Sequence, residues 1–356
     1  MDIVTHGLAS LAVARGFFPR AGKPAIASAF AAGIFANLDA LSLRFGPSAY
    51  FTWHDTYVHS ILAAAIFSVV FSALPSESIP WGRRRISVMK GETLPENPSE
   101  SRTSAAIIRV KAAFLVTLCA ALLHLAMDSC QSSGVMLFWP FSSRRIAADL
   151  LPRIDPWILT ILIACIALPE LLHLVSSEIG AKSSKPRGQT GALIGMALVL
   201  VYIGARATLH SNVLATIESR TFHGETPRRA RAFPETLSIF TWHGVVETES
   251  ALNQIEVDAA SATNFDPEAS MRLFKPEPSP TLDAARNTTA ARRFLAAARI
   301  PKASVEKTES GYTVTLRDLR YAATGETQHE MAAVIELDLN NKVTSQELVW
   351  AKELRH

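Results

Sequence analysis

Two long apolar segments constrain this chain more than any other feature of its sequence. A helix needs about 20 residues to cross a hydrocarbon core of about 30 Å, and residues 104–127 and 189–209 both reach that length. Arg109 and Lys111 lie near the start of the first segment and Arg206 near the end of the second. At those positions, long cationic side chains can extend to the membrane interface. The chain is therefore predicted to be an integral membrane protein.

Four further apolar segments also precede residue 210. Residues 157–175 and 58–74 form two more predicted spans, and 24–38 and 6–18 are shorter and rich in small residues. The predicted fold is a mostly α membrane helix bundle of about four to six membrane helices, followed by a small α+β extracytoplasmic domain.

The remainder of the chain reads as soluble sequence. Residues 281–300 have helical spacing, and four short β-branched or alternating runs predict strands, namely 238–246, 312–321, 331–339 and 343–350. These patterns predict two domains, a membrane-embedded domain at 1–210 and a soluble α+β domain at 211–356. The proline-rich stretch at 75–103 is expected to be a loop.

The distribution of Lys and Arg predicts the orientation, because cytoplasmic loops carry the excess. Three loops are basic: Arg15, Arg20 and Lys23; Arg83, Arg84, Arg85 and Lys90; and Lys182, Lys185 and Arg187. If these are cytoplasmic, the amino terminus and the tail both face the extracytoplasmic side of the membrane. A net charge of +3 without a long basic face argues against a nucleic-acid partner.

Six residues with metal-binding side chains stand at the ends of the predicted helices, all on the extracytoplasmic side: His6, Asp39, His54, His59, His124 and Asp128. His124 and Asp128 are four residues apart, which places both side chains on one face of a helix. Two ligands on one helix, completed from other elements, are a common way to hold zinc.

His54 and His59 remain alternatives. Five residues separate them, or roughly 140° around an ideal helix, so both can point inward only if His54 lies in the loop before the helix. Asp55 is a candidate to orient one of the two rings. A histidine taken alone is more often a packing residue, and it is the grouping of six such side chains on one side that favours a metal site.

Several short motifs resemble the YdjM-type inner-membrane metal-dependent hydrolases. They are Asp-x-x-Thr-His at 2–6, Asn-Leu-Asp at 37–39, His-x4-His-Ser at 54–60, His-x3-Asp-Ser at 124–129 and Pro-Phe-Ser-x-Arg-Arg at 140–145. The resemblance is close over about residues 1–160 and implies that the protein lies in a bacterial inner (plasma) membrane. One departure is that the family's loop usually reads His-Arg-Gly-x-x-His-Ser, whereas Asp-Thr-Tyr-Val separates the two histidines here.

That family is in turn similar to the zinc-dependent phospholipase C and single-strand nuclease superfamily. The similarity implies that Asp39, His54, His124 and Asp128 hold one metal, with Asp128 bridging to a second metal bound by His6. One or two divalent ions, zinc in the first place, are therefore expected as cofactors. No residues match the ligands of that superfamily's third metal.

The function implied is metal-assisted hydrolysis, in which bound metal lowers the pKa of water from 15.7 towards about 7. Arg144 and Arg145 are candidates to pair with a phosphate oxygen, and Asp55 joins them as a candidate catalytic residue. A site at the membrane surface favours a lipid or lipid-linked phosphoester as substrate, with the lipid bilayer as the partner. The alternative is a non-enzymatic membrane protein with a structural metal site and a partner-binding tail. A transporter is less favoured, because no paired broken helices lie at the midplane.

Overall fold

The computed structural model describes residues 1–54, 56–73, 98–178, 188–324 and 330–355. Residue contacts divide the chain into two compact units. The helical unit comprises Met1–Ala40, Asp55–Ala148 and Arg153–Ile203, and the sheet unit comprises Leu41–His54, Asp149–Pro152 and Gly204–His356. The predicted domain boundary at residue 210 stays a prediction. Asp55, most of the predicted 75–103 loop, and the basic residues at 83–90 and 182–187 lie outside the described residues.

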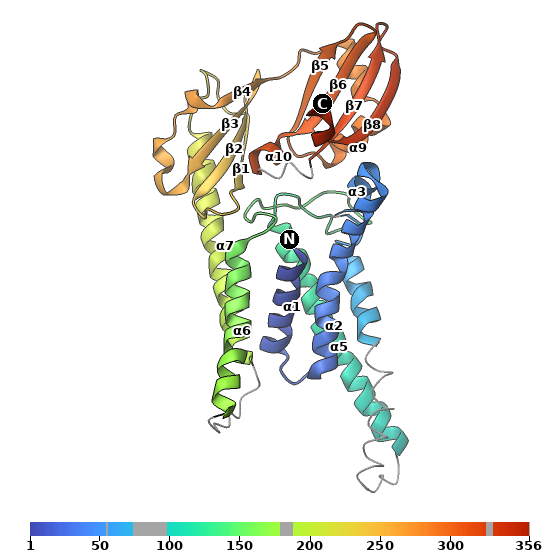
Figure 1. Cartoon of the computed structure of the whole chain (residues 1–356), viewed down its shortest axis with the longest axis vertical. Coiled ribbons are helices and arrows are strands. Elements are labelled where there is room, and N and C mark those ends of the chain that lie inside the picture. The colour runs from blue at the N-terminus through green and yellow to red at the C-terminus, as the bar shows by residue number, and fades with distance from the viewer. Residues whose placement is uncertain (55, 74–97, 179–187, 325–329, 356) are drawn as a thin grey trace. The chain divides into compact units, whose positions relative to one another are not determined.

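The helical unit follows the apolar runs of the sequence. Its helices are α1 (Ile3–Phe17), α2 (Gly22–Phe35), a helix at Ile61–Ala73, α5 (Pro98–Ser129), α6 (Pro156–Glu178) and the first half of α7 (Gln189–Glu218) (Figure 1). The prediction of a helical amino-terminal region is confirmed.

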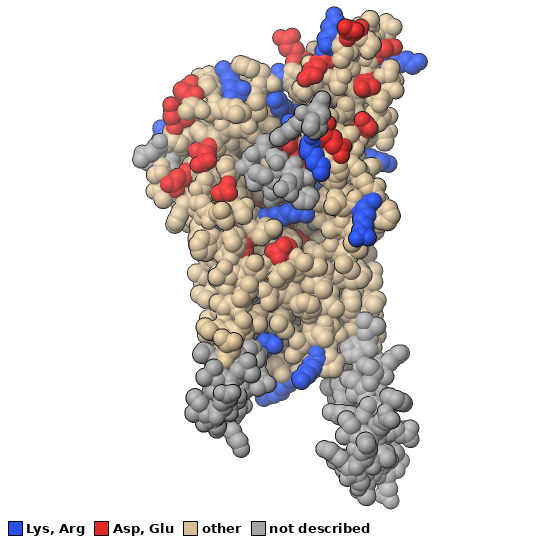
Figure 2. Space-filling view, in the orientation of Figure 1, with Lys and Arg blue, Asp and Glu red and all other residues tan. Residues whose placement is uncertain are grey.

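Three helices of the described chain are long and apolar enough to cross a membrane: Gly22–Phe45, Val110–Ser129 and Gln189–Glu218. The first gains its length because the 3-10 helix η1 (Ala36–Phe45) continues α2. Ile3–Phe17, Ile61–Ala73 and Pro156–Pro169 are apolar but shorter, so a total of four to six spans stays a prediction. Among the described residues on the face shown in Figure 2, the flank of the helical unit is mostly uncharged, as a lipid-facing surface requires.

Small residues let α1, α2 and α5 approach closely. Ala14, Ala29, Val116 and Ala120 are buried together where the three helices meet. A β-carbon added at Gly33 of α2 would lie 1.8 Å from Oγ of Ser10 on α1. Small residues of this kind are the usual contacts between membrane helices, because they bring backbones into van der Waals range.

The sheet unit contains two antiparallel four-stranded sheets, and each of them pairs its strands in chain order. The first has β1 (Arg229–Pro234), β2 (Thr241–Glu247), β3 (Ala251–Asp258) and β4 (Met271–Phe274). The second has β5 (Pro301–Lys307), β6 (Gly311–Asp318), β7 (Met331–Asp338) and β8 (Val343–Trp350). The short helices of the unit are α3 (Pro47–Trp53), α8 (Pro280–Arg286), α9 (Thr289–Ala297) and α10 (Leu319–Thr324), with 3-10 turns η2 (Ala259–Asn264), η3 (Pro267–Ala269) and η5 (Ala351–Arg355).

The helical spacing of residues 281–300 corresponds to two helices and not to one. The first, α8, ends at Arg286, with Asn287 as its C-cap. Thr288 then starts α9, since its side chain accepts a hydrogen bond from the backbone N–H of Ala291. A threonine in this N-cap position begins a new helix rather than continuing the old one.

Each sheet has its own core. The second half of α7 packs Val213 and Ile217 against the first sheet, where Trp242 is fully buried. The second sheet packs against α8 and α9, and Phe51 of α3 stacks on Phe294 of α9 with ring centroids 6.0 Å apart. This aromatic contact accounts for the grouping of the 41–54 segment with the tail.

A buried ion pair holds the second short segment, 149–152, in the sheet unit. Asp149 has a positive φ of 58°, and its carboxylate accepts from both terminal nitrogens of the Arg299 guanidinium, one of them at 2.9 Å. The Arg231 guanidinium lies 3.6 Å from the same carboxylate. The Asp149 side chain is only 7% exposed, so its charge depends on these partners.

Replacing Arg299 by Met is expected to lower the free energy of unfolding by about 3 kcal/mol, because it leaves the buried Asp149 charge with only the more distant Arg231 guanidinium beside it. Urea denaturation of the purified full-length protein measures this change. Arg228→Met is the matched control. Arg228 pairs with Glu249 at 2.8 Å, but both side chains are more than half exposed, so the expected change stays below about 1 kcal/mol. Equal shifts in the two variants would refute a stabilising role for the buried pair.

Candidate metal centre

The residues that begin two helices determine where His6 and His59 lie. Asp2 caps α1 by accepting from the backbone N–H groups of Val4 and Thr5 at 3.0 and 2.9 Å. This cap begins α1 at Ile3 and places His6 in its first turn. Ser60 acts in the same way for the helix Ile61–Ala73, since its Oγ accepts from Ala63 N–H at 3.1 Å. His59 therefore lies in the turn just before that helix.

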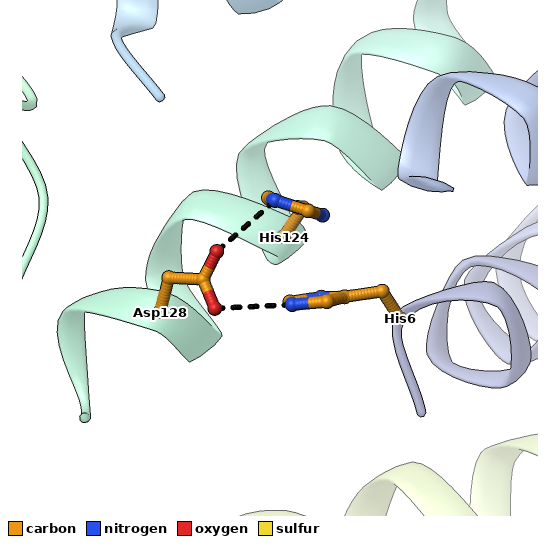
Figure 3. A group of neighbouring side chains, drawn as sticks. All are labelled: His6, His124 and Asp128. Atoms are coloured by element: carbon orange, nitrogen blue, oxygen red, sulfur yellow. Dashed lines mark hydrogen bonds and ion pairs between the residues drawn. The ribbon is translucent and has the colours of Figure 1, made fainter. Parts of the chain in front are cut away.

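Three side chains from α1 and α5 converge at one buried point (Figure 3). His6 Nε2 lies 3.0 Å from Oδ1 of Asp128, and His124 Nε2 lies 3.0 Å from Oδ2. The two imidazole rings stack with centroids 3.7 Å apart. All three residues are at most 2% exposed. The predicted pairing of His124 with Asp128 on one helix face is present, and α1 supplies the third side chain.

The hydrogen bond on the far side of the His124 ring fixes which nitrogen faces Asp128. Nδ1 lies 2.6 Å from the backbone carbonyl oxygen of Gly33. A carbonyl only accepts, so Nδ1 carries a proton, and Nε2 is the ring nitrogen that faces Asp128. A second interaction that orients a metal-binding histidine in this way is a general feature of metal sites.

His124 Nε2 and Asp128 Oδ2 lie 3.0 Å apart, and neither atom has another hydrogen-bond partner among the described residues. A buried carboxylate needs a cation or hydrogen-bond donors beside it, and a metal ion between these ligand atoms would supply that charge. Metal–nitrogen and metal–oxygen distances of about 2.0–2.2 Å separate neighbouring ligand atoms of a tetrahedral site by about 3.3 Å. His6, His124 and Asp128 thus fit a divalent metal ion.

His59 extends this group towards Asp39. Its Nε2 lies 3.4 Å from Oδ2 of Asp128, and its Nδ1 lies 3.3 Å from Oδ2 of Asp39. Of the two alternative histidines, the structure thus brings His59 to Asp128. His54 belongs to the sheet unit, where its ring stacks on Tyr50 at 4.4 Å.

Sequence reasoning missed two further groups at Asp128. Gln131 Nε2 donates to Oδ1 of Asp128 at 2.7 Å, and the α-amino group of Met1 contacts the same oxygen at 2.5 Å. The sequence signal for Gln131 was its spacing. It follows Asp128 by three residues, just beyond the end of α5. Cys130 is also close to the site, but burial raises the pKa of its thiol and the Asp128 charge raises it further. A protonated thiol is a poor ligand.

Among the described residues, the group of His6, His124 and Asp128 does not include the predicted catalytic residues. Asp55 lies outside the described residues. Arg144 is exposed, and its backbone N–H donates to Ser142 Oγ at 3.2 Å. Arg145 is half-buried and donates to the carbonyl oxygen of Gly134 at 3.2 Å. Their roles stay predictions.

An apolar helical unit with a buried His/Asp cluster, followed by two antiparallel sheets, defines the class as a membrane protein with a candidate metal centre. The chain belongs to the YdjM inner membrane protein family, which it matches over residues 1–213. This match confirms the family resemblance drawn from the sequence motifs. Residues 280–356 match the YfhP C-terminal alpha/beta plait domain. No curated protein and no solved structure matches the chain.

Proposed function

We propose that this protein is a membrane-bound metal-dependent hydrolase that cleaves a phosphoester in a lipid or lipid-linked substrate. The observation that carries the proposal is the buried group of His6, His124 and Asp128, in which His124 Nε2 and Asp128 Oδ2 face each other at 3.0 Å. A third ligand, His6, lies on the other oxygen of the same carboxylate. The similarity of the motifs to the zinc-dependent phospholipase C and nuclease superfamily supports phosphoester chemistry and zinc.

The proposed roles of the side chains are as follows. His6, His124 and Asp128 hold the first metal, and Asp39 and His59 are placed to complete it or to hold a second ion. Bound zinc supplies a Lewis acid and lowers the pKa of water at the site.

The protein's own contribution is to fix the ligands and to recognise the substrate. The Gly33 carbonyl fixes the His124 ring, and Gln131 fixes Oδ1 of Asp128. Arg144 has an exposed guanidinium that can pair with a phosphate oxygen by two parallel hydrogen bonds.

The burial of the ligands favours a second candidate, a structural metal with a partner-binding tail. His6, His59, His124 and Asp128 are each at most 2% exposed, and catalytic metal sites keep a coordination position open to substrate. Under the hydrolase proposal, the ligands must become accessible when substrate binds.

Metal content and turnover together distinguish the two functions. The purified protein is stripped with chelator, reloaded with zinc, and assayed for phosphate-monoester and phosphodiester release from phospholipid in mixed micelles. The hydrolase proposal predicts turnover that appears with zinc and falls at least about 100-fold in Arg144→Ala at unchanged metal content. Stoichiometric zinc without turnover on any phospholipid would establish the structural role instead.

We also propose that the site and the tail face the extracytoplasmic side, as the three basic loops of the sequence favour. Alkaline phosphatase fused after Glu218, where α7 ends, is expected to be active. The same enzyme inserted within residues 76–97 is expected to be inactive, because it folds only outside the cytoplasm. The reverse pattern would place the metal centre on the cytoplasmic side.

A further inference from the structure

The turn between β1 and β2, residues 235–240, exposes apolar side chains and is held by hydrogen bonds of its own. Leu237 is 74% exposed and Phe240 is 49% exposed. The hydroxyl of Ser238 accepts from the backbone N–H groups of Phe240 and Thr241 at 3.2 and 3.0 Å. These two backbone donors are thus satisfied within the turn.

The one charged residue of the turn is paired. Glu235 Oε2 lies 2.6 Å from Nε2 of His243 on β2, and Glu235 Oε1 accepts from Thr236 N–H at 2.9 Å. The free-energy cost of removing a hydrogen-bonded carboxylate from bulk water is lower than the cost for a free carboxylate. The turn therefore presents apolar surface beside a carboxylate whose two oxygens are already engaged within the turn and β2.

Arg206 ties this turn to α7. Its Nη1 donates to the carbonyl oxygens of Ser238 and Ile239 at 3.2 and 2.7 Å, and its guanidinium carbon lies 4.5 Å from the Trp242 ring centroid. Arg206 is 1% exposed although it lies within a candidate membrane span. Backbone carbonyls are the partners that make an arginine tolerable at such a position.

The position of Arg206 along α7 links the turn to the apolar stretch of that helix. Leu200 and Val201 are 67% and 70% exposed, and they belong to this stretch. Arg206, which holds the carbonyls of 238 and 239, follows Val201 by five residues on the same helix, or about 7.5 Å at 1.5 Å per residue.

We propose that the 235–240 turn is a membrane anchor of the sheet unit, with Leu237 and Phe240 inserted at the boundary between lipid headgroups and acyl chains. Aromatic and large aliphatic side chains are favoured at that depth. The occupant is the lipid bilayer that surrounds α7. A site for a soluble partner would not need to lie beside a membrane span.

A depth measurement tests the proposal. Leu237→Cys and Phe240→Cys are made in a chain whose three native cysteines are replaced by Ala, labelled with a polarity-sensitive fluorophore and reconstituted in phosphatidylethanolamine and phosphatidylglycerol vesicles. Nitroxide lipids labelled near the headgroup are expected to quench both sites at least twofold more than aqueous iodide does. Leu339→Cys is the matched control, since Leu339 is 60% exposed at the β7–β8 turn of the same unit. It is expected to respond to iodide alone.

Photo-crosslinking covers the case in which the cysteine-free chain does not fold. A benzophenone amino acid at position 237 or 339 of the otherwise native chain is irradiated in vesicles that contain radiolabelled phosphatidylethanolamine. Lipid adducts at 237 and none at 339 are expected. Iodide quenching of 237 equal to that of 339, or no lipid adduct at 237, would overturn the anchor and leave the turn free for a protein partner.

Discussion

Replacing His124 or Asp128 by Ala is expected to remove bound metal from the purified protein and to abolish hydrolysis in the same variants. The two residues contribute candidate ligand atoms 3.0 Å apart, and a transition metal needs about four ligands in fixed geometry. Loss of one ligand should weaken metal binding by more than about 100-fold, since even the loss of an orienting group costs 10–100-fold. Metal analysis of protein purified without chelator measures the loss.

His243→Ala is the matched control for this experiment. His243 also pairs with a carboxylate, Glu235, at 2.6 Å, but it lies on β2 of the sheet unit. Its replacement should leave metal content unchanged. Equal and negligible metal in the wild type and in the His124 and Asp128 variants would show that the cluster is held by hydrogen bonds alone.

The same assay decides between the two histidines that the sequence left as alternatives. His59 lies 3.4 Å from Asp128 and 3.3 Å from Asp39, whereas His54 stacks on Tyr50. His59→Ala is therefore expected to lose more metal than His54→Ala. The opposite order would support His54 as the ligand, as the superfamily resemblance implies.

The parts of the site that depend on helix periodicity were predictable from the sequence. His124 and Asp128 are four residues apart in a long apolar run, so one helix face had to carry both. His6 could be assigned to the same membrane side from charge distribution alone. Periodicity does not reveal which backbone carbonyl meets a histidine, so the role of Gly33 required the packing of α2 on α5.

The sheet unit was harder to predict because its strands are short and two of its segments come from distant sequence. The run at Arg229–Pro234 alternates Arg with Ala and lacks β-branched residues, so β1 was missed. Asp149 joins the tail through Arg299, 150 residues away. A contact of that sequence separation leaves no local pattern in either segment.

Gly33→Leu is expected to have the second large effect, through the position of α1 and α2 rather than through a ligand. A β-carbon at Gly33 would lie 1.8 Å from Oγ and 2.6 Å from Cβ of Ser10. Because the Cβ atom itself is too close, no rotamer of Ser10 relieves the clash. The two helices must separate, which moves His6 on α1 and the carbonyl that holds His124. We expect metal affinity to fall about 10–100-fold and stability to fall by about 1–3 kcal/mol.

Two further variants show whether close packing at Gly33 is the cause. Gly204→Ala is the control, because a β-carbon at Gly204 of α7 meets no atom within 4 Å. In a helix interior it should raise stability by about 0.5–1 kcal/mol and leave metal binding unchanged. Ser10→Gly removes the atoms that a side chain at Gly33 would strike, so Ser10→Gly with Gly33→Ala should bind more metal than Gly33→Ala alone. If the Ser10 change brings no recovery, the α1–α2 contact does not set the geometry of the metal ligands.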